Sequence, residues 1–128
     1  PINRYPLELT KIGIGVAPLA DTGFNAAKSW LKPLEYAAVG IPCVASPRVE
    51  YTRLNKLGVG LLAKNSREWY THVKFLVDNP TARAELAEKG RRVVAELTVE
   101  KQAWRWLEAW TSAAAQVNKN PLKRSAHV

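Results

Sequence analysis

Three short apolar runs, each followed by a segment with a helical pattern, most constrain how this chain folds. They are residues 12–19 (IGIGVAPL), 41–46 (IPCVAS) and 59–64 (VGLLAK). Each run is apolar continuously rather than at alternate positions, which is typical of strands buried on both faces of a parallel sheet. Parallel strands need crossover connections. The pattern therefore predicts an α/β fold with right-handed crossovers: a three-layer, Rossmann-like parallel sheet of about three strands.

Helical segments fill most of the remaining sequence. After a short helix or turn at 5–11, a loop at 24–31 leads to a predicted helix at 32–39. That helix has Pro33 in its first turn and Gly40 at its end. A second helix is expected at 50–57, closed by Gly58.

The C-terminal half predicts three further helices. Ser66 is a favourable N-cap for the first, which Asp78-Asn79-Pro80 ends; the second spans residues 81–97, and Thr98 caps the third. The last residues, 118–128, are polar and basic. We therefore expect a partial Rossmann-like domain at 1–117 and a flexible basic tail at 118–128.

The chain has 128 residues and a net charge of +8. Such a charge attracts nucleic acid, anionic lipid or phosphorylated metabolites. The basic residues of the last forty positions follow helical spacing or lie in the tail, without interleaved exposed aromatics, so we expect no nucleic-acid partner. Nucleic-acid binding is an alternative that rests on charge alone. No apolar run approaches the ~18 residues of a membrane helix, and with Cys43 as the only cysteine we expect a cytoplasmic protein.

The residues around the start of the helix at 32–39 fit a phosphorylated ligand. A diphosphate needs N–H donors and positive charge, which a helix N-terminus supplies together with Lys28, Ser29 and Lys32. Glu35 lies one turn further on, and a carboxylate accepts hydrogen bonds from the two hydroxyls of a ribose. The alternative is that Lys32 and Glu35 form an ordinary surface pair worth ~0.2–0.5 kcal/mol.

The stretch 16–46 (VAPLADTGFNAAKSWLKPLEYAAVGIPCVAS) resembles the donor-binding region of GT-B glycosyltransferases, especially those similar to family 4. Segments further along, GVGLLAK and DNPTARAELAEKGRRVV, also resemble closing segments of this family, so the similarity covers about residues 5–115. The positions that match the family pattern are Pro18, Lys32, Glu35, Gly40, Pro42 and Val44.

The resemblance implies that the chain binds a nucleotide-diphosphate sugar. Glu35 matches the second glutamate of the family's Glu-x7-Glu motif, which holds the donor ribose. The positions that match diphosphate contacts are Lys28, Ser29, Leu31 and Lys32. The first glutamate of the motif is replaced by Ala27, which puts the sugar contact and a retaining mechanism in doubt. Asp21 or Asn25, from the same loop, are candidate substitutes.

Only the latter part of one of the two GT-B domains is matched. The resemblance therefore implies an acceptor-binding domain on a missing segment or another chain, and a chain that is inactive alone. A free sheet edge would also allow oligomers. The alternative is a non-catalytic module, either a nucleotide-sugar sensor or a structural interaction domain. No cofactor or metal is expected.

Other reactive or aromatic side chains fit structural roles better. Trp106 and Trp110 are i, i+4 neighbours on a helical pattern, and we expect them and Trp104 to pack against apolar surfaces. Trp30 either covers the donor or is buried. Cys43 lies in an apolar run and is expected to be inert. Glu50 and Tyr51 follow the second strand and could line the cleft. The two histidines, His72 and His127, are isolated.

Overall fold

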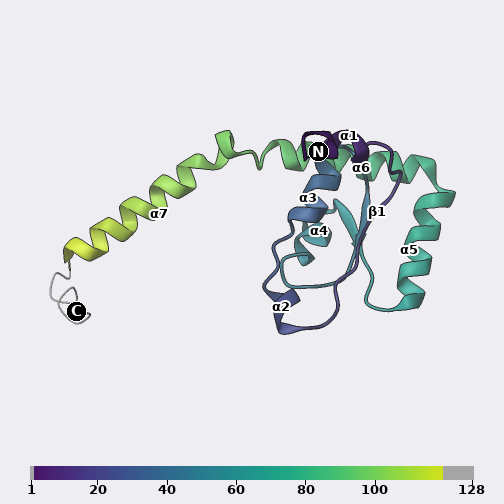
Figure 1. The fold of residues 1–128 in the computed structure, drawn as a ribbon, viewed down its shortest axis with the longest axis horizontal. Coiled ribbons are helices and arrows are strands. Elements are labelled where there is room, and N and C mark those ends of the chain that lie inside the picture. The colour runs from purple at the N-terminus through teal and green to yellow at the C-terminus, as the bar shows by residue number, and fades with distance from the viewer. Residues whose placement is uncertain (1, 120–128) are drawn as a thin grey trace. The chain divides into compact units, whose positions relative to one another are not determined.

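The computed structural model describes residues 2–119 and divides into two compact units, Pro1–Ala95 and Glu96–Val128 (Figure 1). The first unit carries the sheet and the second carries one long helix. In chain order the first unit contains η1 (Ile2–Arg4), α1 (Tyr5–Leu9), β1 (Gly15–Ala17), α2 (Gly23–Ala26), α3 (Leu31–Ala38), β2 (Cys43–Ala45), α4 (Thr52–Leu57), β3 (Gly60–Leu62), α5 (Ser66–Asp78) and α6 (Pro80–Ala95).

The three strands form a parallel sheet in the order β1-β2-β3, which confirms the predicted α/β fold. Val16, Val44 and Leu61 are register partners and therefore share one face of the sheet. β2 lies in the centre, and its three residues are at most 1% exposed. Continuous apolarity thus correctly predicted burial on both faces for this strand.

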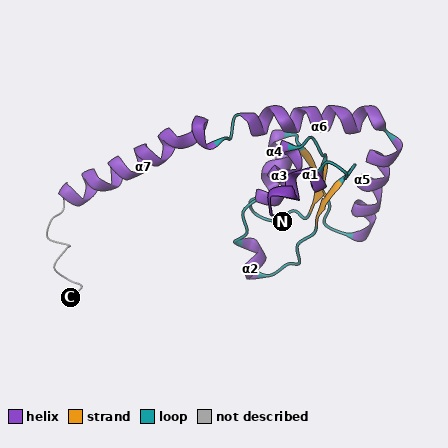
Figure 2. Ribbon diagram, turned by 45° about the horizontal axis from the view of Figure 1, so that its top comes forward, coloured by secondary structure: helices purple, strands orange, loops and turns teal. Residues whose placement is uncertain are grey.

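Helices cover both faces of the sheet (Figure 2). On one face, Leu34 of α3 and Leu54 of α4 pack with the alanines and Cys43 of the strands. On the other face, Leu76 of α5 is fully buried against Val44. Helix α6 contacts both α3 and α5 and contributes to both cores. The sheet is therefore the middle layer of three, as predicted.

Strand β1 is less buried than its sequence predicts. Val16 is 48% exposed, although it shares a face with the fully buried Val44. Leu76 of α5 packs over Val44, and the described residues do not extend that layer over Val16. The expectation of burial on both faces was therefore wrong for this edge strand.

Two local expectations were also wrong in detail. The loop expected at 24–31 contains the single helical turn α2, capped by the Thr22 hydroxyl, which accepts a hydrogen bond from Asn25 N at 3.2 Å. The N-cap of α5 is Asn65 rather than Ser66, because Asn65 Oδ1 accepts from Glu68 N at 2.9 Å. Adjacent Asn and Ser are both good caps, so the sequence did not separate them.

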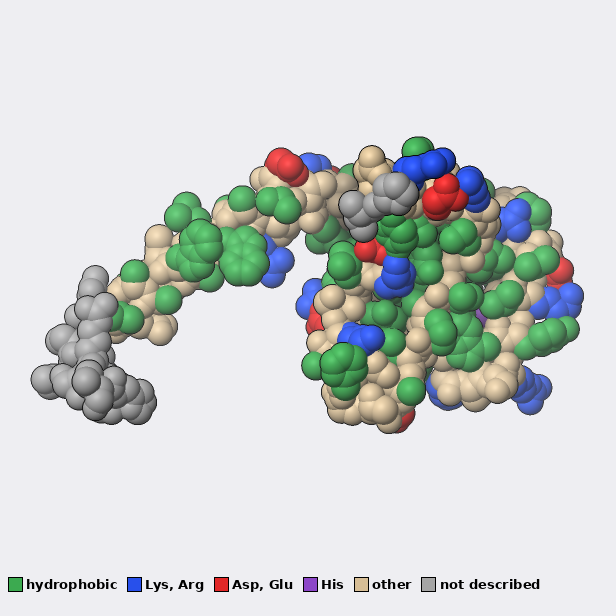
Figure 3. All heavy atoms as spheres, in the orientation of Figure 1, with side chains coloured by type: hydrophobic (Ala, Val, Ile, Leu, Met, Phe, Trp, Pro, Cys, Tyr) green, Lys and Arg blue, Asp and Glu red, His purple; other side chains and the backbone are tan. Residues whose placement is uncertain are grey.

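The second unit consists mainly of α7 (Val99–Lys119), which Thr98 caps through a 3.4 Å hydrogen bond from Lys101 N. Trp106 and Trp110 contact each other along this helix, with ring centroids 6.1 Å apart. These rings and Trp104 are at least 60% exposed. Figure 3 shows hydrophobic side chains, in green, on the surface of α7. Their packing against another apolar surface therefore remains a prediction.

The expected tail lies mostly outside the described residues. Residues 120–128, which include His127, are not described. Asn118 and Lys119, the first two residues of the expected tail, are the last two residues of α7. The boundary expected at residue 117 remains a prediction. Within residues 2–119, none of the helices combines the length and apolarity that a membrane crossing needs.

Two glycines with positive φ end the helices on one face of the sheet, as predicted. Gly40 follows α3 with φ 75°, and Gly58 follows α4 with φ 64°. In both cases a cation of α6 lies over the glycine: the Arg91 guanidinium at Gly40 and the Lys89 ammonium at Gly58. Positive charge is favourable at helix C-termini, where carbonyl groups are unpaired.

The Gly40→Ala substitution should destabilise the first unit. An added Cβ would collide with the Arg91 guanidinium, and a left-handed alanine costs about 1–2 kcal/mol. We expect urea unfolding to show a loss of at least about 1 kcal/mol. Gly13→Ala is the matched control, because an added Cβ there meets nothing within 4 Å. Equal stability of the two variants would contradict the strain at Gly40.

Candidate functional site

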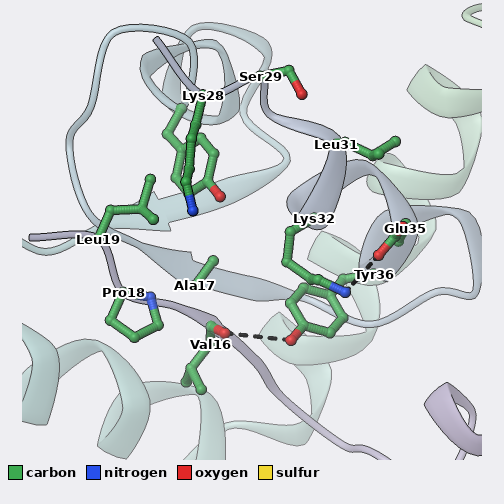
Figure 4. Close-up of a pocket in the computed structure, with 11 residues that line it drawn as sticks. Val16, Ala17, Pro18, Leu19, Lys28, Ser29, Leu31, Lys32, Glu35 and Tyr36 are labelled. Carbon is green, nitrogen blue, oxygen red and sulfur yellow. Dashed lines mark hydrogen bonds and ion pairs between the residues drawn. The ribbon is translucent and has the colours of Figure 1, made fainter. Parts of the chain in front are cut away.

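A pocket of about 430 Å³ opens where β1 ends and α3 begins (Figure 4). Its floor comes from the end of β1 and the residues after it, and Tyr36 and Tyr51 also contribute to its wall. All five site residues expected from helix α3 and the segment before it line the same pocket: Lys28, Ser29, Leu31, Lys32 and Glu35. The structure therefore brings this part of the predicted set together.

Local sequence explains why α3 starts beside this pocket. Pro18 ends β1, and the chain turns through α2 before α3 starts at Leu31 with Pro33 in its first turn. The N-cap residue, Trp30, makes no capping hydrogen bond with its side chain. Within residues 2–119, the first-turn N–H groups of α3 thus have no side-chain acceptor at the end of the helix that favours anions.

Lys32 and Glu35 form an ion pair at the wall of the pocket. Lys32 Nζ lies 2.7 Å from Glu35 Oε2, and both side chains are partly exposed. Hydrogen bonds to Glu35 and Tyr5 raise the pKa of Lys32 well above its usual range. Burial alone would raise the pKa of Glu35, but the hydrogen bonds from Lys32 and Tyr5 outweigh it, so that pKa is lowered. The pair is therefore charged at neutral pH.

Tyr5 joins this pair and was missed by the sequence analysis. Its hydroxyl donates to Glu35 Oε2 at 2.7 Å and accepts a hydrogen bond from Lys32 Nζ. Thirty residues separate Tyr5 from Glu35, and α1 carries it to the site. No spacing or motif links the two positions, so only the tertiary structure reveals the contact.

Aromatic rings flank both lysines of the pocket. Lys32 Nζ lies 4.8 Å from the centroid of the Tyr5 ring and 5.8 Å from that of Tyr36. Lys28 Nζ lies 5.2 Å from the centroid of the Phe24 ring. Figure 4 shows Lys28 and Lys32 approaching the pocket from two sides. Because ring faces attract cations, these contacts restrain two otherwise flexible side chains.

Two of the expected site residues lie outside this pocket. Asp21 pairs with Arg48 and lines a neighbouring hollow at the carboxyl ends of the strands. The Asn25 amide donates to the carbonyl oxygen of Ala20 at 3.0 Å. Their side chains therefore bind parts of the surrounding loops. Ala27, at the C-cap of α2, brings no carboxylate to its position.

The remaining candidates divide between core and surface. Trp30 was expected either to cover the donor or to be buried, and it is buried in the core. The Arg53 guanidinium lies 5.6 Å from its ring centroid. Tyr51 lines the pocket, whereas Glu50 pairs with Arg53 at 2.8 Å outside it. Burial raises the pKa of Cys43 to about 12, which leaves its thiol unreactive at neutral pH.

The chemistry that the pocket offers is recognition rather than nucleophilic attack. It combines two ammonium groups, a serine hydroxyl, a helix N-terminus and one carboxylate. In residues 2–119, no three His, Cys, Asp or Glu side chains gather in a way that could hold a metal ion. This arrangement suits an anionic group next to a hydroxyl-bearing group.

A family model described as glycosyl transferase-like matches residues 9–108 of this chain. This match spans both the sheet and the pocket and covers most of the sequence. The chain therefore belongs to the glycosyl transferase-like family. No curated protein and no solved structure matches the chain closely enough to be counted.

The lowered pKa of Glu35 predicts a pH dependence of stability. A carboxylate whose folded pKa lies below its unfolded value of about 4.5 stabilises the fold above that pH. This contribution is lost as the pH falls through the folded pKa. When the pH falls from 6 to 3, we expect the free energy of unfolding to decrease less for Glu35→Gln than for the wild type. Urea titration at each pH measures this difference. A parallel loss in the two proteins would show that the pair does not stabilise the fold.

Proposed function

We propose that this chain is the donor-binding part of a GT-B glycosyltransferase similar to family 4, and that its pocket binds the nucleoside diphosphate of a sugar donor. The observation that carries the proposal is the convergence of Lys28, Ser29, Lys32 and Glu35 in one pocket. The family match supports glycosyl transfer as the general reaction. The position at the carboxyl end of a parallel strand supports a nucleotide ligand.

Each part of the ligand has a matching part of the pocket. The diphosphate lies between Lys28 and Lys32, near the first-turn N–H groups of α3. A ribose hydroxyl donates to Glu35, whose Oε1 atom accepts no hydrogen bond from residues 2–119. In the complete enzyme, the two lysines stabilise the negative charge on the departing diphosphate while the sugar moves to an acceptor hydroxyl.

In this proposal, another stretch of polypeptide or another chain supplies the acceptor-binding domain. It also supplies the remaining strands of a larger sheet. Within the described residues β1 is an edge strand, and its outer side supports pairing with a further strand. The same edge could instead join two copies of this chain. We further propose that the protein works in the cytoplasm.

A non-catalytic nucleotide-sugar-binding module is the second candidate. Ala27 favours it, because the position expected to contact the sugar has no carboxylate. The expected substitutes are also engaged elsewhere, Asp21 with Arg48 and Asn25 with Ala20. Binding without transfer, in a complete protein supplied with donor and acceptor, would support this candidate over the enzyme.

Calorimetry with UDP, GDP and their sugar conjugates tests the proposed ligand. We expect Glu35→Ala to weaken binding about 10- to 100-fold, because a hydrogen bond to a charged group contributes about 1.5–3 kcal/mol. Asp78→Ala is the matched control, since it removes another helical ion pair, the more exposed one with Lys74 on α5, away from the pocket. Loss of affinity in both variants would argue against a specific role for Glu35.

Binding of inorganic pyrophosphate distinguishes the proposed phosphate contacts of the site from its proposed ribose contact. Lys28→Ala should weaken binding of both pyrophosphate and UDP, because it removes a charge near the phosphates. Glu35→Ala should weaken UDP binding alone, because pyrophosphate has no ribose. Tight, salt-sensitive DNA binding without nucleotide binding would instead favour the charge-based alternative and overturn the proposal.

A further inference from the structure

The hydroxyl group of Tyr5 lies at the centre of the charged cluster in the pocket wall. It donates to Glu35 Oε2 at 2.7 Å and accepts from Lys32 Nζ, which itself lies 2.7 Å from the same oxygen. Tyr5, Lys32 and Glu35 thus form a closed triangle of hydrogen bonds. Two of its corners line the pocket, and Tyr5 reaches them from α1.

The ring of Tyr5 adds a second restraint. Lys32 Nζ lies 4.8 Å from the ring centroid of Tyr5, so one residue restrains the ammonium group both through its π-face and through its hydroxyl. A lysine on a four-carbon stem has many rotamers in solution, and a partly exposed pair with Glu35 holds it only weakly. Tyr5 therefore adds two contacts that restrain Lys32 beyond its pair with Glu35.

The triangle also determines which part of Glu35 is available. Tyr5 and Lys32 both bind Oε2, whereas Oε1 accepts no hydrogen bond from the described part of the chain. A carboxylate held by one oxygen presents the other in a defined direction. Such preorganisation improves affinity, because less freedom is lost when the ligand binds.

We propose that Tyr5 is a positioning residue of the nucleotide site, which fixes Glu35 so that Oε1 accepts a ribose hydroxyl. This inference rests on the proposed nucleotide-binding function. Tyr5 itself does not line the pocket, and it acts through Glu35 rather than through contact with the ligand.

Tyr5→Phe tests this role because it removes the hydroxyl and keeps the ring beside Lys32. We expect calorimetry to show UDP binding weakened about 3- to 10-fold, as for the loss of one ordinary hydrogen bond. In a Glu35→Ala background, the same substitution should have no further effect on UDP binding. Tyr70→Phe is the matched control, because Tyr70 is exposed on α5. Circular dichroism checks that each variant is folded.

The outcomes separate this inference from the proposed function. If the wild type binds UDP and Tyr5→Phe binds it equally well, the positioning role is wrong and the proposed function stands. If Tyr5→Phe costs the same factor with and without Glu35, Tyr5 acts on the fold in general and the inference is also wrong. If the wild type binds no nucleoside diphosphate, both proposals fall.

A measurement on the wild type covers the case in which Tyr5→Phe does not fold. Adding UDP should shift the 13Cζ NMR signal of Tyr5, because its hydroxyl bonds to the carboxylate that receives the ribose. The shift should saturate with the dissociation constant found by calorimetry, and Tyr70 should not respond. An unchanged Tyr5 signal at saturating UDP would overturn the inference.

Discussion

Burial of β2 between two helical layers is the constraint on which the rest of the first unit depends. Its residues are at most 1% exposed because it pairs with β1 and β3 and carries helices on both faces. Parallel pairing also determines where α3 lies. The chain must leave the carboxyl end of β1 and return to the start of β2, so the crossover helix begins near the carboxyl ends of the strands. The position of the pocket thus follows from the topology.

Lys32 makes more contacts in the pocket than the small stabilisation from its ion pair explains. An ion pair at this spacing contributes only about 0.2–0.5 kcal/mol, and solvent screens it further when it is exposed. Lys32 nevertheless has two aromatic rings and a tyrosine hydroxyl around it. Fixed charges are most useful where a charged ligand arrives, because they need no reorganisation on binding. These additional contacts of Lys32 support a ligand-binding role over a simple surface pair.

The elements of this fold could be predicted from the sequence because each has a strong local signal. Continuous apolar runs indicated the strands, and Gly40 and Gly58 indicated where helices end. Residues in the segment 28–35 met in one pocket because they lie on or next to one helix. Local sequence signals did not reveal a role that depends on distant partners. Tyr5 reaches Glu35 across thirty residues, and Trp30 is buried because of the core around it.

Short polar side chains were the least predictable part of the site. Asp21 and Asn25 were expected as substitutes for a glutamate at position 27 because they lie in the same loop, yet they bind Arg48 and the Ala20 carbonyl group. Short side chains readily bond to nearby backbone or to a neighbouring loop, so proximity in sequence says little about where they point.

The pocket residues and Ala27 differ in what they offer a ligand, and this difference bears on how the proposed donor would be recognised. In the proposed site the lysines are the partners of the phosphates and Glu35 is the partner of a ribose hydroxyl, whereas Ala27 has no polar side chain to offer a sugar. In a site of this kind, affinity comes from the nucleoside diphosphate and is shared by donors that carry different sugars. Discrimination between sugars then requires groups outside residues 28–35. The proposed acceptor-binding domain is the natural source, because it would face the sugar once the two parts close around the donor.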